Sequence, residues 1–250
     1  MNDIGDYAKY ALLRALCSSG PATIRLGVIW YLTEHAELNG DGRRRPHLVR
    51  EGWDDLDPDL LIKMRAIESA LRDEDDLHVG LIERSGILPA DTVFFSEALP
   101  EAVRSGQLRI NQRADWFARA RQTLTGCNLV FLDPDNGLEV RSVTPTSRLA
   151  GKYVTVAEVT ELLSIGAGVI LYQHCDRSPW RAQRERVQAQ LASIVGELLT
   201  VRSLRFGAFG ARAFFCISVQ PDITATINTA LRALHERVAS WDKAHYFLFE

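Results

Sequence analysis

The stretch Asn128-Leu-Val-Phe-Leu-Asp-Pro-Asp-Asn-Gly137 decides the fold expected for this chain. Its apolar residues 129–132 are typical of a strand buried on both faces, and Asp133-Pro-Asp-Asn-Gly137 then ends that strand. Carboxylates therefore stand at the carboxyl end of a strand. In open α/β sheets this end carries the ligand-binding loops, because the strands hold the loops rigidly around a crevice. The alternative is that these five residues form only a tight turn.

Strand and helix patterns alternate on both sides of this stretch. Further strands are expected at 25–32, 92–96 and 168–172, and helices at 6–16, 60–71, 114–124, 154–163 and 180–199. The end of the chain predicts a two-stranded hairpin over 200–219, a helix over 223–241 and a last strand at 246–249. This order predicts an α/β fold, with a mostly parallel central sheet, helices on both faces and a C-terminal antiparallel hairpin.

The composition is that of a globular protein, with 250 residues of which 46% are apolar and 24% charged. We expect a single domain over 1–250, with 43–90 as a candidate inserted or helical subregion. No apolar run is long enough to cross a bilayer, so no membrane partner is expected. The chain starts without the pattern of a signal peptide, and its four scattered cysteines suit reduced thiols, so a cytoplasmic location is expected.

Residues at the ends of predicted elements are candidates for a binding site. Lys9 lies in the second turn of the first helix, where it either reaches an anionic ligand or is an ordinary surface lysine. Glu97 follows the strand at 92–96, at the position that binds ribose hydroxyls in nucleotide-binding folds. Tyr172, His174 and Arg177 lie at the end of the strand at 168–172. His174 is a candidate general base or substrate contact, or else a structural histidine.

Together these motifs resemble the adenine-amine methyltransferases that act on large-subunit ribosomal RNA, a family with an Asp-Pro-Pro-Tyr motif. Asp6-Tyr-Ala-Lys-Tyr10 is similar to the family's Asp-x-x-Lys-His. Tyr31-Leu-Thr-Glu-His-Ala36, followed by Gly40-Asp-Gly-Arg43, is similar to its Tyr-Leu-Asp-Thr-His-Ala-Gly-x-Gly-Arg segment. Glu97-Ala-Leu-Pro100 is similar to its Glu-Leu-His-Pro, and Asp133-Pro-Asp-Asn136 stands in the place of Asp-Pro-Pro-Tyr.

The resemblance implies a Rossmann-like class I methyltransferase fold, S-adenosylmethionine as cofactor, and nucleic acid, RNA or DNA, as partner. Cofactor contacts would come from Lys9, His35, Gly40, Gly42 and Glu97. The catalytic motif would be Asp133, Pro134, Asp135 and Asn136, with Asp133 accepting a hydrogen bond from the target amine. Substrate contacts would come from Tyr172, His174 and Arg177. Because Asp135 and Asn136 replace a proline and an aromatic ring, the stacking surface for the base is expected at Tyr153, Tyr172 or Trp180.

The sequence thus predicts that Glu97 and Asp133 face one hollow at one rim of the sheet, where a methyl group is transferred to an exocyclic amine of a base. Two other functions stay open. Asp133, Asp135 and Glu139 would suit a metal-dependent nuclease or phosphoesterase, because hard cations prefer oxygen ligands, and either Asp3 and Asp6 together or Asp176 could add to such a site. The third is a non-catalytic nucleotide-binding module, because a fold does not fix a function.

Overall fold

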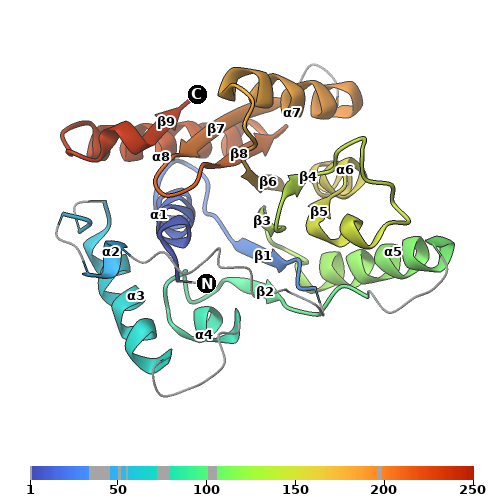
Figure 1. The fold of residues 1–250 in the computed structure, drawn as a ribbon, viewed down its shortest axis with the longest axis horizontal. Helices are drawn as coiled ribbons and strands as arrows, with labels where there is room; N and C mark the ends of the chain where they lie inside the picture. The colour runs from blue at the N-terminus through green and yellow to red at the C-terminus, as the bar shows by residue number, and fades with distance from the viewer. Residues whose placement is uncertain are drawn as a thin grey trace.

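A seven-stranded sheet forms the centre of the molecule (Figure 1). The computed structural model describes residues 2–33, 46–49, 52–54, 56–71, 79–100, 106–195 and 199–250. The strand order is β2 (Val93–Phe95), β1 (Leu26–Trp30), β3 (Leu129–Asp133), β6 (Gly168–His174), β8 (Arg212–Ser218), β7 (Thr200–Phe206) and β9 (Phe247–Phe249). The first four are parallel, and β8 and β9 run antiparallel to their neighbours. The predicted α/β fold with a mostly parallel sheet and an antiparallel C-terminal part is confirmed.

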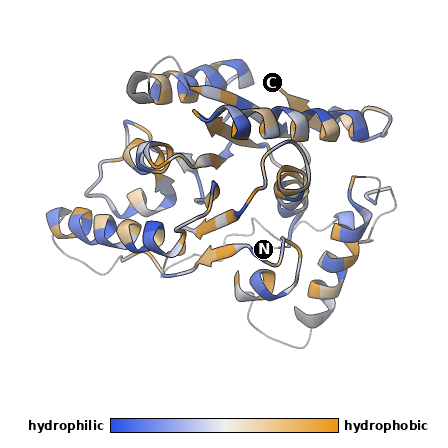
Figure 2. Ribbon diagram, turned by 180° about the vertical axis from the view of Figure 1, so that it is seen from behind, coloured by the Kyte–Doolittle hydropathy of each residue, from blue (hydrophilic) through white to orange (hydrophobic). Residues whose placement is uncertain are grey.

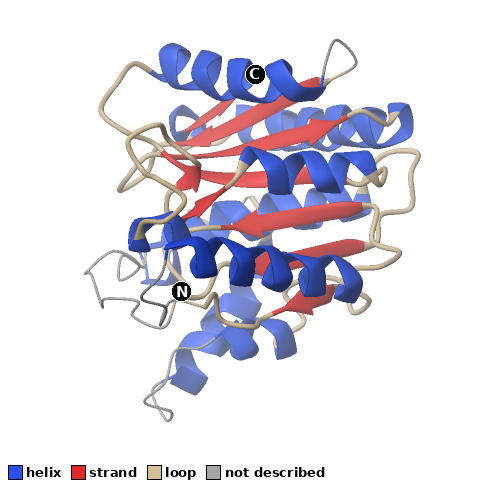
Figure 3. Cartoon of the chain, turned by 90° about the vertical axis from the view of Figure 1, so that its right-hand side faces the viewer, coloured by secondary structure: helices blue, strands red, loops and turns tan. Residues whose placement is uncertain are grey.

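Helices cover both faces of the sheet (Figure 3). On what we call the α1 face, the covering helices are α1 (Ile4–Ser18), α2 (Pro46–Val49), α3 (Pro58–Leu71), α4 (Val79–Arg84) and α8 (Pro221–Ala239). On the α5 face they are α5 (Gly106–Thr123), α6 (Val156–Ser164) and α7 (Trp180–Val195). Alternate residues of β3 follow this division, since Phe131 belongs to the first core and Leu132 to the second.

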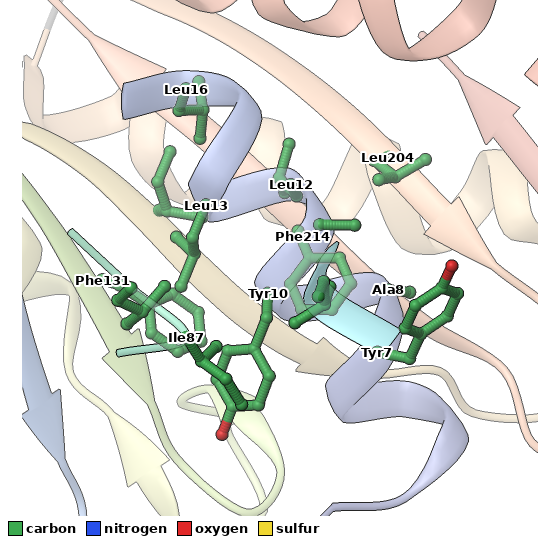
Figure 4. Close-up of a cluster of buried hydrophobic side chains, with 14 of the residues drawn as sticks. Tyr7, Ala8, Tyr10, Leu12, Leu13, Leu16, Ile87, Phe131, Leu204 and Phe214 are labelled. Atoms are coloured by element: carbon green, nitrogen blue, oxygen red, sulfur yellow. The ribbon is translucent and has the colours of Figure 1, made fainter. Parts of the chain in front are cut away.

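The outer helices are amphipathic and the strands are apolar (Figure 2). Helix α1 differs, because most of its residues are buried between the sheet and the other helices of its face. Tyr7 and Tyr10 project from this helix one turn apart, and Phe131 and Phe214 of the sheet pack along it (Figure 4). A helix buried on several sides is held by tertiary packing more than by its own helical propensity.

Short elements complete the fold. A separate two-stranded ladder joins β4 (Gly137–Leu138) to β5 (Tyr153–Val154), and two 3₁₀ turns lie at Arg148–Lys152 and Ala244–Tyr246. The sequence patterns predicted neither ladder strand, because two residues are too few for a period to be visible. None of the helices in the described ranges is both long and apolar enough to cross a membrane.

The candidate subregion 43–90 packs as part of the α1 face in its described portions. Leu48, Trp53 and Met64 belong to the same core as α1 and the strands. Helix α5 begins at Gly106, eight residues before the predicted start at Ala114, because its first two turns are mostly polar and show little apolar periodicity.

Candidate active site

Asp133 is the last residue of β3 and lies at the edge of the sheet where the parallel strands end. Trp30 of β1 is level with it on one side, and Tyr172 of β6 follows on the other. Tyr172 pairs in turn with Phe214 of β8. Asp133 is thus a single charged side chain in a row that is otherwise aromatic, on the α1 face of the sheet.

Lys9 of α1 holds the Asp133 carboxylate. Its Nζ lies 2.9 Å from Oδ2 of Asp133 and 2.8 Å from Oδ1 of Asp6, one turn earlier on the helix. The Lys9 side chain is only 8% exposed, and its ammonium also lies 5.8 Å from the ring centre of Trp30 and 5.7 Å from that of Phe131. The sequence expectation that Lys9 reaches out to the cofactor is therefore not supported, because its charge is shared between the buried carboxylate of Asp6 and the partly buried carboxylate of Asp133.

The two carboxyl groups that share Lys9 have pKa values that move in opposite directions. Burial raises the pKa of the Asp133 carboxyl, and the attraction of Lys9 only partly offsets this rise. Burial alone would also raise the pKa of Asp6, but Lys9 holds that pKa well below its ordinary range. Burial alone would lower the pKa of Lys9, yet Asp133 and Asp6 raise it. Lys9 therefore stays charged, and Asp133 is the carboxyl that more readily takes up a proton.

A second ion pair fixes the start of α1 above this edge. Asp3 is the N-cap of the helix: its carboxylate accepts hydrogen bonds from the backbone N–H groups of Gly5 and Asp6, while the Asp6 carboxylate accepts one from the N–H of Asp3. Arg212, the first residue of β8, donates to Asp3 at 3.2 Å and lies across Gly5, where a Cβ atom would be 1.1 Å from its Nη1. The helix start is therefore tied to the hairpin of β7 and β8.

The turn after Asp133 is locked in place by Gln173 of β6. The Gln173 side chain accepts a hydrogen bond from the N–H of Leu138 and donates one to the carbonyl of Asn136. Gly137 between them has a φ of 116°, and a Cβ atom there would lie 2.3 Å from Oε1 of Gln173. This turn therefore needs a glycine, and Asn136 contributes its backbone to the turn.

One oxygen of Asp133 is left for a ligand. Oδ2 is held by Lys9, whereas Oδ1 accepts no hydrogen bond from any residue that the structure describes. The Asp133 side chain is 17% exposed. Nearby, the buried hydroxyl of Tyr10 lacks a hydrogen-bond partner in the described part of the chain, and burial raises its pKa so that it stays protonated. Buried polar groups usually have partners, so an acceptor oxygen and an O–H donor remain to be satisfied at this edge.

Glu97 does not lie in the same hollow as Asp133. Its carboxylate pairs with Arg119 of α5 at 2.8 Å, and both side chains are about half exposed. The register explains the separation, because Phe95, two residues before Glu97, is level with Ile29, whereas Asp133 is level with Trp30. Consecutive residues of β1 face opposite sides of the sheet. The expectation of one shared hollow is therefore wrong: Asp133 points to the α1 face and Glu97 to the α5 face.

The acidic residues of the proposed metal site are also directed apart. Asp135 is exposed and lies 3.6 Å from Lys152, while Glu139 accepts a hydrogen bond from the N–H of Val156 at the start of α6. Within the described ranges, no three His, Cys, Asp or Glu side chains are close enough together to hold a metal ion. The arrangement thus gives no support to Asp133, Asp135 and Glu139 as joint metal ligands.

Of the other predicted residues, Pro134 is buried next to Asp133, and Tyr172 is half-buried beside it on the α1 face. His174 and Arg177 are exposed at the end of β6 and beyond it. His35, Gly40 and Gly42 lie outside the described residues. Tyr153 and Trp180 lie in β5 and at the start of α7, and Trp180 packs against Phe215.

Sequence reasoning named Asp6 and Lys9 but not the ion pair between them, and it assigned no role to Gln173 or Arg212. The Asp6–Lys9 pair has i,i+3 spacing on a helix, which is a usable signal. Gln173 and Arg212 gave no such signal, since their partners are 35 and 209 positions away in the chain.

Two cavities lie away from Asp133. One of about 650 Å³ is lined by Arg14, Asp57 and Arg237 beside the second half of α1. The other, of about 520 Å³, lies between α5 and α6 and is lined by Phe117 and Tyr153. Neither is lined by Asp133 or Lys9.

Comparison with known proteins identifies a distant structural neighbour but no family. No family model matches the sequence, and no curated protein matches it significantly. Among solved structures, the chain is similar to protein LPL1258 from Legionella pneumophila strain Philadelphia 1, which is described by the family model DUF519. The two chains are 11% identical with a TM-score of 0.49, and the alignment covers 100% of this chain and 97% of the other. A likeness of this strength carries no functional conclusion.

Proposed function

We propose that this protein transfers a methyl group from S-adenosylmethionine to an exocyclic amine of a nucleic-acid base, and that Asp133 is the residue that orients the amine. The observation that carries the proposal is the asymmetry of the Asp133 carboxylate. Lys9 fixes one oxygen at 2.9 Å, and the other oxygen is left to accept a hydrogen bond at the edge of the sheet.

An exocyclic amine is a poor nucleophile, because its lone pair is delocalised into the ring. A fixed carboxylate that accepts an N–H bond can orient this lone pair toward the methyl donor without fully removing the proton. Once the new N–C bond forms, the nitrogen must lose a proton. Because burial raises the pKa of Asp133, its carboxylate is a better acceptor for that proton than an exposed aspartate.

S-adenosylmethionine would supply the methyl group as an electrophile when bound. Part of the molecule fits such a cofactor: β1 has β2 on one side and β3 on the other, and ligands in open α/β sheets bind at this kind of crossover, next to the strand ends. Glu97 faces away, so we now assign it no contact with the cofactor. The described residues thus support the proposed contact of Asp133 with the acceptor amine more strongly than they support the proposed binding of the cofactor.

The test is transfer of labelled methyl groups to RNA and DNA from cells that lack the gene, followed by digestion and separation of the nucleosides. We expect a methylated exocyclic amine with the unaltered protein and a loss of rate of about 100-fold or more in Asp133→Ala. Asp115→Ala, which removes an exposed carboxylate of α5, is the matched control and should keep full activity.

Two results would contradict the proposal. One is an Asp133→Ala variant as active as the unaltered protein, and the other is no methyl transfer to either nucleic acid. If no methyl transfer is seen, calorimetric titration with S-adenosylhomocysteine shows whether the protein still binds the cofactor product. Binding without any transfer would favour the non-catalytic nucleotide-binding module.

A further inference from the structure

A cavity of about 520 Å³ opens between helices α5 and α6, which lie on the same face of the sheet (Figure 1). Protein cavities that bind small molecules usually have volumes of about 300–1,000 Å³ and mostly apolar walls with a few polar groups. The walls here have this character, with the rings of Phe117 and Tyr153 and the aliphatic side chains of Ile110 and Val143. The cavity therefore has room for a small molecule that carries an aromatic ring system.

A buried ion pair lines one side of this cavity. Arg113 of α5 donates from Nε to Oε1 of Glu158 at 2.7 Å and from Nη1 to the carbonyl of Ala150 at 2.7 Å. The Glu158 carboxylate also accepts hydrogen bonds from the Tyr31 hydroxyl at 3.1 Å and from the N–H of Thr155 at 2.9 Å. The Arg113 and Glu158 side chains are only 13% and 7% exposed. The two charges compensate each other, so this side of the cavity is rigid and neutral as a whole.

Glu139 brings a further carboxylate to the cavity. Two arginines and three glutamates are among the described residues that line it, and besides the buried pair Arg121 binds Glu161 at 3.1 Å. Oε1 of Glu139 accepts a hydrogen bond from the N–H of Val156 at 2.8 Å, whereas Oε2 accepts none from the part of the chain that the structure describes. Arg113 lies near this carboxylate, but its hydrogen bonds go to other acceptors. These lining side chains thus leave one net negative charge and one free carboxylate oxygen.

We propose that the cavity between α5 and α6 binds a small aromatic amine, with its ring against Phe117 and Tyr153 and its ammonium group on Oε2 of Glu139. A hydrogen bond between an ammonium group and a carboxylate is stronger than one between neutral groups, and an anionic ligand of the same shape would be repelled. The inference goes beyond the proposed function and is independent of it, because neither Asp133 nor Lys9 lines the cavity.

The experiment is isothermal titration calorimetry with two probes, tryptamine and indole-3-propionate, which share a ring system and differ in the sign of their charge. We expect tryptamine to bind about 10-fold more tightly or better. Glu139→Gln keeps an acceptor for the N–H of Val156 and removes the charge, so it should weaken tryptamine binding about 10-fold. Glu236→Gln, which changes an exposed carboxylate of α8, is the matched control and should bind tryptamine normally.

A second variant tests where the probe binds. Ala157 is exposed in the first turn of α6 and lines the cavity, so Ala157→Leu narrows the cavity without altering the core. We expect this variant to keep the circular dichroism spectrum of the unaltered protein and to bind tryptamine about 10-fold more weakly or worse.

Three results of the first titrations would overturn the inference: no binding of tryptamine, equal affinity for the two probes, and full tryptamine affinity in Glu139→Gln. Full affinity in Ala157→Leu would overturn it as well, because the probe would then bind elsewhere. The outcome is separate from that of the methylation assay, since the titration needs neither nucleic acid nor S-adenosylmethionine.

Discussion

At the scale of single residues, the site depends on a lysine that binds two carboxylates of its own chain rather than a ligand. Lys9 holds Asp133 and Asp6 together, so we regard it as a positioning residue. A buried charge is tolerated when its partners are close and well oriented, and removing one partner leaves the others without compensation.

Lys9→Met should therefore destabilise the fold by about 3–5 kcal/mol, because the buried Asp6 carboxylate and the partly buried Asp133 carboxylate would lose their counter-ion. Urea denaturation followed by circular dichroism measures the effect. Lys63→Met is the matched control, since Lys63 pairs with Asp59 at 3.3 Å on the surface and such pairs contribute about 0–1 kcal/mol. A Lys9 variant as stable as the Lys63 variant would mean that the buried pair contributes little.

Sequence reasoning identified Asp133 correctly as a residue at a strand end, but it could not place Glu97. Each residue's face within its own strand follows from alternation along the chain. The relation between two strands depends on their register, and a shift of one residue reverses every side chain. Here the register joins Phe95 to Ile29 and Asp133 to Trp30, so Glu97 and Asp133 diverge.

At the scale of elements, the turn between β3 and β4 keeps Asp133 at the end of its strand. The acidic turn was predicted from its residue types, whereas its attachment to β6 through Gln173 was not, because the two segments are far apart in the chain. The residues that form a turn are neighbours in the sequence and can be recognised there. The side chain that holds the turn in place can come from a distant part of the chain, as Gln173 does here.

Gly137→Ala tests this attachment. We expect a loss of about 2–4 kcal/mol, which combines a strained backbone at φ 116° with a clash against the Gln173 side chain. Gly86→Ala isolates the backbone contribution, because Gly86 has a φ of 67° and no atom within 4 Å of its Cβ position, and it should cost about 1 kcal/mol. Thermal denaturation of both variants gives the difference, and equal losses would exclude the clash.

At the scale of the whole molecule, the α/β class followed from long apolar runs and helical periodicity. The contacts between segments that are distant in the chain could not be predicted in this way, because no sequence pattern indicates them. Trp53 lies between the first and last parts of the chain: its carbonyl accepts a hydrogen bond from the Tyr7 hydroxyl, and its ring lies 5.5 Å from that of Trp241 and 6.2 Å from that of Tyr246.

Trp53→Ala should lower the free energy of unfolding by about 3–5 kcal/mol, because a large buried ring would be replaced by a cavity. Equilibrium unfolding in urea checks this value. Ile62→Ala, at a side chain that is 64% exposed on α3, should change it by less than about 0.5 kcal/mol. A small effect at Trp53 would show that the helices between β1 and β2 are attached mainly through other contacts.

The ion pair between Asp3 and Arg212 has a consequence for synthesis of the protein. A ribosome that has made the first 200 residues has released α1 but not the arginine that crosses its first turn, nor α8, which packs along it. Until both emerge, the nascent chain carries an apolar helix without its final cover, and such surfaces attract chaperones or other unfinished chains. The Asp133 edge therefore cannot be assembled until β8 and α8 have both left the ribosome.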